Sequence, residues 1–351
     1  MRTFPCASIA VTRAGQLLAL KSLGSFVYRQ GARGDRSLEN REITPGTLFD
    51  LASLTKPVAT TTMAMILHER GLLELDAPVI GTIPEFLVDS CGEVDARRRE
   101  VTFRQLLAHS SGLPAYEKLF LIAHSREELL RAAFIMPLSA DPGTRAEYSD
   151  IGFIILGAAL ERIADETLDI FCQREVFGPL QMAHTTFNPP PDARGRIPPT
   201  ADERTFRKRI IQGEVQDENA SILGGVAGHA GLFSTAEDLA RFAHMMLSGG
   251  SPIVRAETVA LFTRREPVPA GTSRALGWDT PSSPSQSGNY FGSRSYGHLG
   301  YTGTSLWIDP DRELSVTLLT NRTWPDCANQ AIKQVRPRFH DAVVEAIDKL
   351  K

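Results

Sequence analysis

The chain has 351 residues, of which 42% are hydrophobic and 23% charged, and its formal net charge is −3. This length and composition are typical of a soluble globular protein with one large or two closely packed domains. The small negative charge gives no reason to expect nucleic acid or an anionic membrane surface as a partner. The apolar segments are too short or too interrupted by charge to span a membrane.

The start of the chain and its cysteines bear on the compartment. The first 20 residues lack the uninterrupted apolar run of a signal peptide, because Pro5, Arg13 and Gly15 break it. The four cysteines are scattered and show no CxxC pair or metal-ligand spacing: Cys6, Cys91, Cys172 and Cys327. We therefore expect reduced thiols in a cytoplasmic protein, with no metal and no cofactor.

The first elements in chain order are predicted strands. Residues 6–11 and 17–20 are strand-like runs joined by a turn at Gly15, which predicts a β-hairpin. A third short run, residues 47–51, leads into a segment with apolar residues at helical spacing. That segment ends at Gly71, a residue suited to a helix C-cap.

The middle of the chain, to about residue 270, is predicted to be mostly helical. The main helical segments are residues 101–113, 151–165 and 235–250. Thr102 and Thr235 are N-cap signals for the first and the last of them. Residues 188–200 are rich in proline and glycine and are predicted to form a loop.

Strand character returns after residue 270. Residues 301–308 and 314–321 are predicted strands, and the sequence DPDRE between them favours a hairpin turn. A final helix is predicted over residues 328–350.

Because strands lie at both ends of the chain and helices between them, we predict an α+β fold. An antiparallel sheet is flanked by helices, and an all-helical domain is inserted into it. The sheet domain is expected to be discontinuous, residues 1–50 and 271–351, and the helical domain to cover residues 51–270. A cleft between the two is the expected place for an active site.

The strongest local signal for chemistry is the sequence SLTK at Ser53–Lys56. Residues three apart share one face of a helix, so this spacing places Lys56 one turn from the Ser53 hydroxyl. A serine hydroxyl becomes a good nucleophile when a neighbour takes its proton, and a lysine with a lowered pKa can do so. The pattern also occurs by chance in helices, so by itself it does not establish a site.

Two further segments could supply partners for Ser53. Tyr148 precedes an apolar helix, and a tyrosine beside a lysine can act as general base to the serine and later as acid to the leaving group. The segment GHLGY, residues 297–301, is rich in glycine, which on an edge strand lets a substrate approach closely. The N–H of Tyr301 could join that of Ser53 in an oxyanion hole. Each segment alone also fits a purely structural role.

Taken together, SxxK, Tyr-x-Asp and His-x-Gly form an ordered set. The set resembles the three-part signature of the penicillin-recognising serine enzymes, SxxK, [YS]-x-N and [KHW]-[TSG]-G. The chain is most similar to the branch of class C β-lactamases, D-peptidases and family VIII esterases. The resemblance covers nearly the whole chain, including the segments FDLASLTKPVAT, PGTRAEYSDIGFIILG and GHLGYTGTSLWIDP.

The resemblance implies a β-lactamase/transpeptidase-like fold and a serine hydrolase that works through an acyl-enzyme. It implies that Ser53 is the nucleophile, that Lys56 orients and activates it, and that Tyr148 is the base for acylation and activates water for deacylation. The residues that it implies at the substrate are Asp150, His298, Gly300 and Tyr301, the last through its backbone N–H.

The sequence departs from the family pattern at two positions. Asp150 stands where the family usually has asparagine, and a carboxylate can only accept hydrogen bonds. It could instead pair with Lys56, keep that lysine cationic and leave the role of base to Tyr148. His298 replaces a lysine and so removes a permanent cation for a substrate carboxylate. Both changes count against efficient β-lactamase activity.

Two other alignments of the motifs are possible, and several other polar residues could belong to the site. Ser149-Asp150-Ile151 could be aligned with an SDN motif, but an isoleucine cannot form the hydrogen bond required at the third position. Tyr301-Thr302-Gly303 competes for the third motif. Further polar residues are interpreted as architectural rather than as substrate contacts: His109, Ser110, His229 and the run Asp217-Glu218-Asn219.

We rank three classes of substrate. A carboxylesterase for short acyl chains comes first, because it needs no fixed cation. A cytoplasmic amidase or D-peptidase for cell-wall fragments comes second, since VQDENA and GGVAGHAGLF resemble segments of family members that remove peptides from muramic acid. A β-lactamase or wall-crosslinking enzyme comes third, because both need export. A catalytically silent ligand-binding protein is the alternative of another class.

Overall fold

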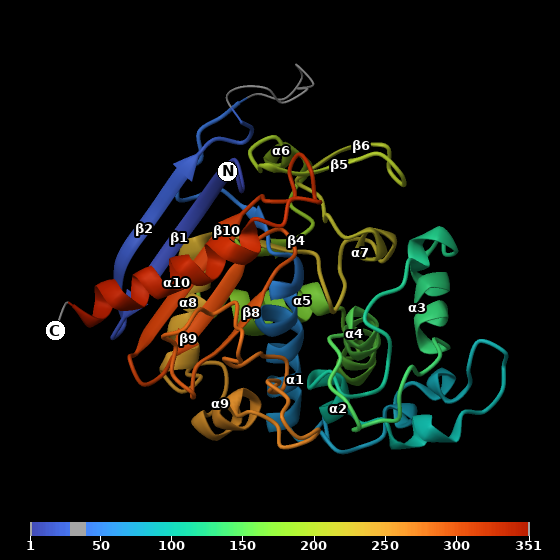
Figure 1. Ribbon diagram of the computed structural model, residues 1–351. Coiled ribbons are helices and arrows are strands. Elements are labelled where there is room, and N and C mark those ends of the chain that lie inside the picture. Colours follow the sequence, from blue (N-terminus) through green and yellow to red (C-terminus); the bar gives the residue numbers. More distant parts are fainter. Residues whose placement is uncertain (1, 29–39, 350–351) are drawn as a thin grey trace.

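The largest sheet joins the two ends of the chain. The computed structural model describes residues 2–28 and 40–349, and its five-stranded antiparallel sheet has the order β2-β1-β10-β9-β8. The strands are β1 (Cys6–Arg13), β2 (Gln16–Gly24), β8 (Tyr296–Leu299), β9 (Ser305–Asp309) and β10 (Leu314–Thr320). Figure 1 shows the blue N-terminal hairpin beside the orange C-terminal strands, with β8 at the far edge.

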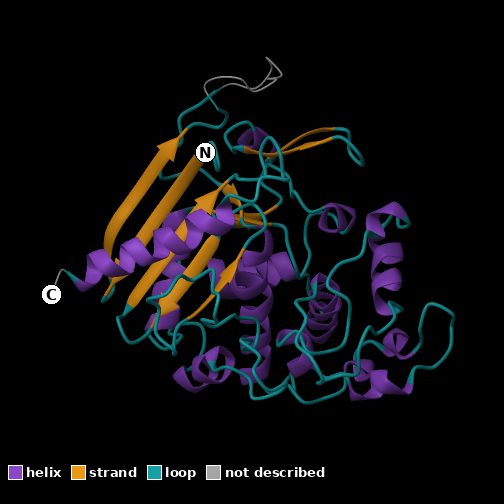
Figure 2. Ribbon diagram, viewed as in Figure 1, coloured by secondary structure: helices purple, strands orange, loops and turns teal. Residues whose placement is uncertain are grey.

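Helices cover both faces of this sheet, as Figure 2 shows. Helix α10 (Ile332–Asp348) lies on one face, where Val344 and Ile347 pack with Val316 and Trp307. Helix α8 (Ala236–Leu247) contacts β1 and β10. Because both faces are covered, every residue of β10 is buried, and the strand is apolar or hydroxyl-bearing throughout.

The helical part of the molecule surrounds α4 (Asp150–Ala164), whose residues Ile151–Leu160 are all buried. The remaining helices are α1 (Thr62–Glu69), α2 (Phe103–Leu107), α3 (Arg126–Phe134), α5 (Leu168–Cys172), α6 (Pro191–Arg194), α7 (Glu218–Ile222) and α9 (Ala256–Thr263). Short strands complete it: β3 (Phe49–Asp50), β4 (Thr186–Phe187) and β7 (Leu232–Ser234) form one sheet, and β5 (Pro199–Glu203) pairs with β6 (Arg209–Gln212).

Most of the predicted elements are present, with shifted ends. The N-terminal hairpin is confirmed, and Thr102 and Thr235 cap α2 and α8 through their side chains. Helix α2 is shorter than predicted, because His109 adopts a left-handed backbone with φ of 56° and turns the chain. The predicted loop 188–200 contains the short helix α6. The predicted C-terminal helix is α10, and position 350 lies outside the described residues.

The prediction of a strand over residues 301–308 was wrong at its start. Residues 300–304 form a turn, closed by a hydrogen bond from Gly300 N to Thr304 O (2.8 Å). The hydroxyls of Thr302 and Thr304 donate to the backbone of Asp50 and Leu51 (2.8 and 2.9 Å), and this ties the turn to the segment before Ser53. The strand begins only at Ser305.

The domain boundaries stay a prediction. Helix α8 packs on the sheet, although it lies within the range 51–270 that we assigned to the helical domain. Among the described residues, no helix has the length and apolar character needed to cross a membrane.

A close contact between two glycines fixes α4 against the segment before β7. A Cβ atom on Gly228 would overlap the carbonyl oxygen of Phe153 and lie 2.9 Å from Gly157 Cα. We expect Gly228→Ala to lower the free energy of unfolding by about 1–3 kcal/mol, because overpacking forces the backbone apart. Gly46→Ala is the control, since no atom lies within 4 Å of that Cβ position. Urea denaturation of both variants checks this, and equal midpoints would contradict it.

Candidate active site

Ser53 lies on a short helical turn, Ala52–Leu54, between β3 and the helical segment that begins at Lys56. Ala52 has a φ of 48°, in the left-handed region that costs a non-glycine residue roughly 1 kcal/mol. Asp50 Oδ1 accepts the Ala52 N–H (2.8 Å) and holds this backbone. The turn presents Ser53 at the wall of the cavity described below.

The structure brings Ser53, Lys56 and Tyr148 together. Lys56 Nζ donates to Ser53 Oγ (3.0 Å), and Tyr148 Oη donates to the same oxygen (2.7 Å). Lys56 Nζ also lies 4.8 Å from the centre of the Tyr148 ring. The serine oxygen is therefore held between a lysine and a phenol, as a nucleophile and its proton-transfer partners require. The catalytic roles themselves stay a prediction.

Asp150 pairs with Lys56, which is the alternative that its carboxylate suggested. Asp150 Oδ1 lies 2.6 Å from Lys56 Nζ, and the Lys56 side chain is fully buried. Asp150 stands in the first turn of α4, where the helix N-terminus favours a negative charge. Burial lowers the pKa of Lys56, whereas the charge and hydrogen bond of Asp150 act to raise it. Lys56 is thus a buried amine whose charge depends on its anionic neighbours.

Tyr148 is a neutral phenol in this arrangement. Burial raises its pKa well above 10, the charge of Asp150 raises it further, and the hydrogen bond with Ser53 only partly offsets this. A free tyrosinate is therefore disfavoured. Tyr148 can still pass a proton if it takes one from Ser53 while it gives its own to a leaving group.

The His298 side chain is a neutral acceptor beside the nucleophile. It stands on the edge strand β8 and is 3% exposed, and Nδ1 donates to the carbonyl oxygen of Leu299 (2.9 Å). Burial, followed by the nearby charges of Lys56 and Arg274, holds the pKa of His298 well below 6.5. It therefore supplies no positive charge near neutral pH, as the sequence suggested.

Gly300 and Tyr301 occupy the turn after β8. A Cβ atom on Gly300 would overlap the Thr304 hydroxyl and the Leu51 carbonyl, so this glycine lets the turn pack against the segment before Ser53. The Tyr301 carbonyl accepts Arg322 Nε (2.6 Å). The N–H of Tyr301 has no hydrogen-bond partner among the described residues. It is available for an oxyanion.

A cavity of about 720 Å³ opens at Ser53. Six of the seven predicted site residues line it: Ser53, Tyr148, Asp150, His298, Gly300 and Tyr301. The seventh, Lys56, is buried behind them. One side is formed by β8 and the start of α10, and the other by the N-terminal ends of α4 and α7. Such a volume is suited to a small molecule or a short peptide.

Arg274 is a cavity residue that we did not single out from the sequence. Its guanidinium carbon lies 5.6 Å from the centre of the Tyr148 ring. Its ion pair with Asp279 is long, at 3.7 Å, and its guanidinium forms no hydrogen bond to the described residues. The segment SRALGWD gave no signal, because an isolated arginine is usually a surface residue.

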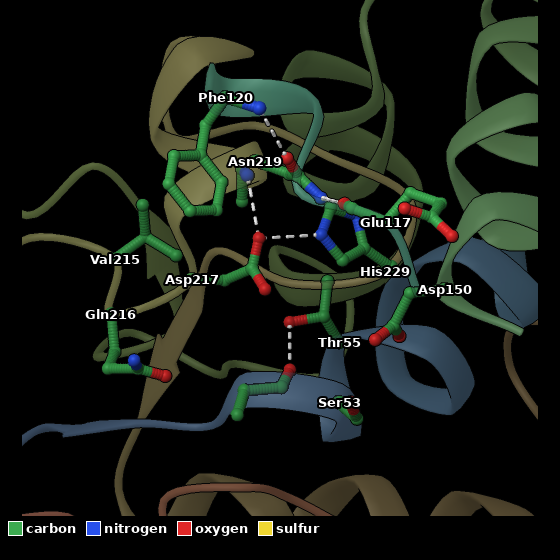
Figure 3. A network of polar contacts seen from close by, with 12 residues as sticks. Ser53, Thr55, Glu117, Phe120, Asp150, Val215, Gln216, Asp217, Asn219 and His229 are labelled. Carbon is green, nitrogen blue, oxygen red and sulfur yellow. Dashed lines mark hydrogen bonds and ion pairs between the residues drawn. The ribbon is translucent and has the colours of Figure 1, made fainter. Parts of the chain in front are cut away.

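Asp217 and His229 also reach the site, although the sequence favoured an architectural role for them. Asp217 Oδ1 lies 2.8 Å from His229 Nε2, and the His229 carbonyl accepts Lys56 Nζ (3.0 Å). Figure 3 shows the contact between Asp217 and His229 above Ser53 and Asp150. His109 is architectural as predicted, because its Nδ1 accepts the N–H of Ser149 (3.0 Å), the residue that caps α4.

Comparisons with known proteins identify the family. A family model described as Beta-lactamase matches residues 1–336. An N-acetylmuramyl-L-alanine amidase of Bacillus subtilis (strain 168) is 31% identical over 91% of this chain and 77% of the relative. A putative D-alanyl-D-alanine carboxypeptidase of Escherichia coli (strain K12) is 29% identical over 91% of this chain and 79% of the relative.

Solved structures share the fold. A class C β-lactamase from Rhodobacter sphaeroides superposes with a TM-score of 0.70 at 21% identity, covering 97% of this chain and 95% of that one. A penicillin-binding protein homologue from Pyrococcus abyssi, described as octameric, gives 0.68 at 21% identity, covering 95% and 74%. The predicted arrangement of an antiparallel sheet with flanking helices is confirmed.

Proposed function

This chain belongs to the β-lactamase family of serine hydrolases, and from that premise we propose that it cleaves an amide or ester through a covalent acyl-enzyme on Ser53. The main support is the serine oxygen itself, which accepts hydrogen bonds from both Tyr148 (2.7 Å) and Lys56 (3.0 Å) at the wall of the cavity. No cofactor is required by this chemistry.

The proton path follows from the neutral state of Tyr148. The Tyr148 O–H, which donates to Ser53 Oγ in the free enzyme, turns toward the leaving nitrogen or oxygen. Ser53 Oγ then attacks the acyl carbon while its own proton moves to Tyr148 Oη, and the phenol proton moves to the leaving atom. The N–H groups of Ser53 and Tyr301 hold the oxyanion. In deacylation, water attacks the acyl carbon and gives its proton to Tyr148, whose own proton returns to Ser53. Lys56 offsets the negative charge that passes through the site.

We propose a peptide fragment of the cell wall as the substrate and an amide as the scissile bond. Similarity to a muramyl-L-alanine amidase over most of the chain supports this choice. The ester ranked first from sequence because His298 gives no fixed cation. Arg274 offers one in the same cavity, and a guanidinium that forms no hydrogen bond to the described residues is suited to the carboxylates of such a peptide.

A carboxylesterase for short acyl chains is the second candidate. The neutral, buried His298 favours it, since an uncharged ester needs no counterion at that position. We also propose that the enzyme works in the cytoplasm on recycled fragments, with no membrane or nucleic-acid partner. All four cysteines are free, which is the usual state in a reducing compartment.

The substrate class can be tested with three compounds: N-acetylmuramyl-L-alanyl-D-glutamate, a peptide ending in D-alanyl-D-alanine, and a nitrophenyl ester of a short acid. We expect release of L-alanyl-D-glutamate from the first, seen by mass spectrometry, and slower turnover of the others. Hydrolysis of the ester alone would favour the second candidate. No hydrolysis of any compound by folded protein would favour a silent binding protein.

A further inference from the structure

One hydrogen-bond acceptor of Lys56 lies outside the three sequence motifs: the backbone oxygen of His229. An ammonium group carries three N–H donors. Lys56 Nζ donates to Ser53 Oγ (3.0 Å), to Asp150 Oδ1 (2.6 Å) and to the backbone oxygen of His229 (3.0 Å). Because the side chain is fully buried, a lost acceptor leaves an unpaired donor. The His229 carbonyl therefore helps to set the position of the ammonium.

The His229 carbonyl is fixed by the contacts of its own residue and of its neighbour. The His229 ring is bound to Asp217 Oδ1 through Nε2 (2.8 Å), and Figure 3 shows the imidazole turned toward that carboxylate. The carbonyl of Gly228 accepts Thr60 Oγ1 (2.7 Å), and Gly228 packs closely against Gly157 of α4. The backbone at residues 228–229 is thereby held from several sides.

Asp217 belongs to a turn that also supports the nucleophile and the cavity wall. Its Oδ1 accepts a second hydrogen bond, from a backbone N–H in the first turn of α7 (2.7 Å). The preceding N–H, of Gln216, donates to Asp50 Oδ2 (2.7 Å), and Asp50 holds the backbone before Ser53. The Asn219 side chain bonds to the backbone of residues 117–120 at 3.0 and 2.8 Å. A change at Asp217 thus reaches Lys56 along a defined path.

Lys56 and Asp217 each stabilise the charged form of the other. Burial lowers the pKa of Lys56, and the carboxylates of Asp150 and Asp217 act to raise it. Burial acts to raise the pKa of Asp217, but its contact with His229 and the charge of Lys56 hold that pKa below its usual range. Lys56 also faces the cation of Arg274 and the neutral groups of Tyr148, His109 and His298. Asp217 also faces Asp50, Glu218 and Tyr116.

We propose that Asp217 and His229 form a positioning pair for Lys56. Asp217 fixes the imidazole, the imidazole fixes the His229 carbonyl, and that carbonyl and the Asp217 charge together hold Lys56 as an ammonium against Ser53. The pair acts through Lys56. This inference rests on the proposed acyl-enzyme mechanism.

The test is the rate at which Ser53 reacts with a fluorophosphonate, measured across pH on the full chain. Asp217→Asn keeps the size of the side chain and removes its charge. We expect the rate to fall about 10- to 100-fold, because the ammonium is displaced. We also expect the basic limb of the pH profile to move to lower pH, because Lys56 loses an anion that stabilises its charged form. A purely structural role for Asp217 would not move that limb.

Glu117→Gln is the matched control. It removes one negative charge from the exposed side chain of Glu117, whose backbone alone takes part in the network. This variant is expected to keep both the rate and the pH profile of the wild type. Two variants of His229 test the proposal independently if Asp217→Asn folds poorly. His229→Gln retains an N–H donor for Asp217 and should keep most of the wild-type rate of labelling. His229→Leu has no such donor and should lose that rate.

Two failures can be told apart. If the wild type reacts at Ser53 but Asp217→Asn and His229→Leu match Glu117→Gln in rate and in pH profile, the positioning pair is wrong and the acyl-enzyme stands. If the folded wild type gives no adduct at Ser53, the acyl-enzyme proposal is wrong, and the inference about Asp217 and His229 falls with it.

Discussion

Ser53→Ala is expected to abolish covalent labelling and to reduce hydrolysis by at least about 10³-fold, because the acyl-enzyme cannot form without its nucleophile. Intact-protein mass spectrometry after incubation with a fluorophosphonate should show one adduct on the wild type and none on the variant. Few contacts of the fold are lost, since the Ser53 side chain is held by Lys56 and Tyr148 alone among the described residues. The variant should therefore keep the circular dichroism spectrum of the wild type.

A penicillin in a parallel incubation adds information about the substrate. A lasting penicilloyl adduct on the wild type would support an enzyme of the cell-wall type. Labelling of Ser53→Ala at the same level as the wild type would contradict the assignment of the nucleophile. A wild type that is folded but reacts with neither reagent would leave the ligand-binding protein as the better description.

Asp150→Asn is expected to destabilise the protein in a pH-dependent way. The substitution leaves Lys56 buried without its counterion, and breaking a buried ion pair costs about 3–5 kcal/mol. In the variant the folded-state pKa of Lys56 falls further below its unfolded value of 10.5. The folded state then binds fewer protons than the unfolded state, so the free energy of unfolding rises with pH. The loss should be largest near pH 6 and smaller near pH 9.

Chemical denaturation of Asp150→Asn and the wild type at these two pH values checks the prediction. Glu237→Gln is the control, because it breaks an exposed ion pair with Arg241 whose side chains are both more than 40% exposed. Its effect should lie within about 1 kcal/mol at either pH. An equal loss for Asp150→Asn at pH 6 and pH 9 would show that Lys56 does not change its charge in this range. The same variant should lose activity, since its Lys56 no longer holds a stable positive charge.

The order of the motifs was enough to identify the family and the three residues at the centre of the site. Ser53 and Lys56 are three residues apart on one helical segment, so their contact follows from local geometry. Tyr148 is 95 residues away from Ser53, and it was found by resemblance to a known signature and not by spacing. The pairing of Asp150 with Lys56 was anticipated because a carboxylate cannot replace the donor of an amide.

The sequence by itself determined the α+β class, the N-terminal hairpin and the starts of the helices capped by Thr102 and Thr235, because these depend on periodicity, capping residues and local motifs. It also predicted the serine and its two partners, Lys56 from spacing and Tyr148 from resemblance to a known signature. Only the tertiary structure decided that the His229 carbonyl receives Lys56, that Asp217 holds the His229 ring, and that Arg274 lies in the same cavity. These contacts join segments separated by up to 173 residues, such as Lys56 and His229. No local pattern encodes them, since packing of α4 and of the turn before β7 brings them together.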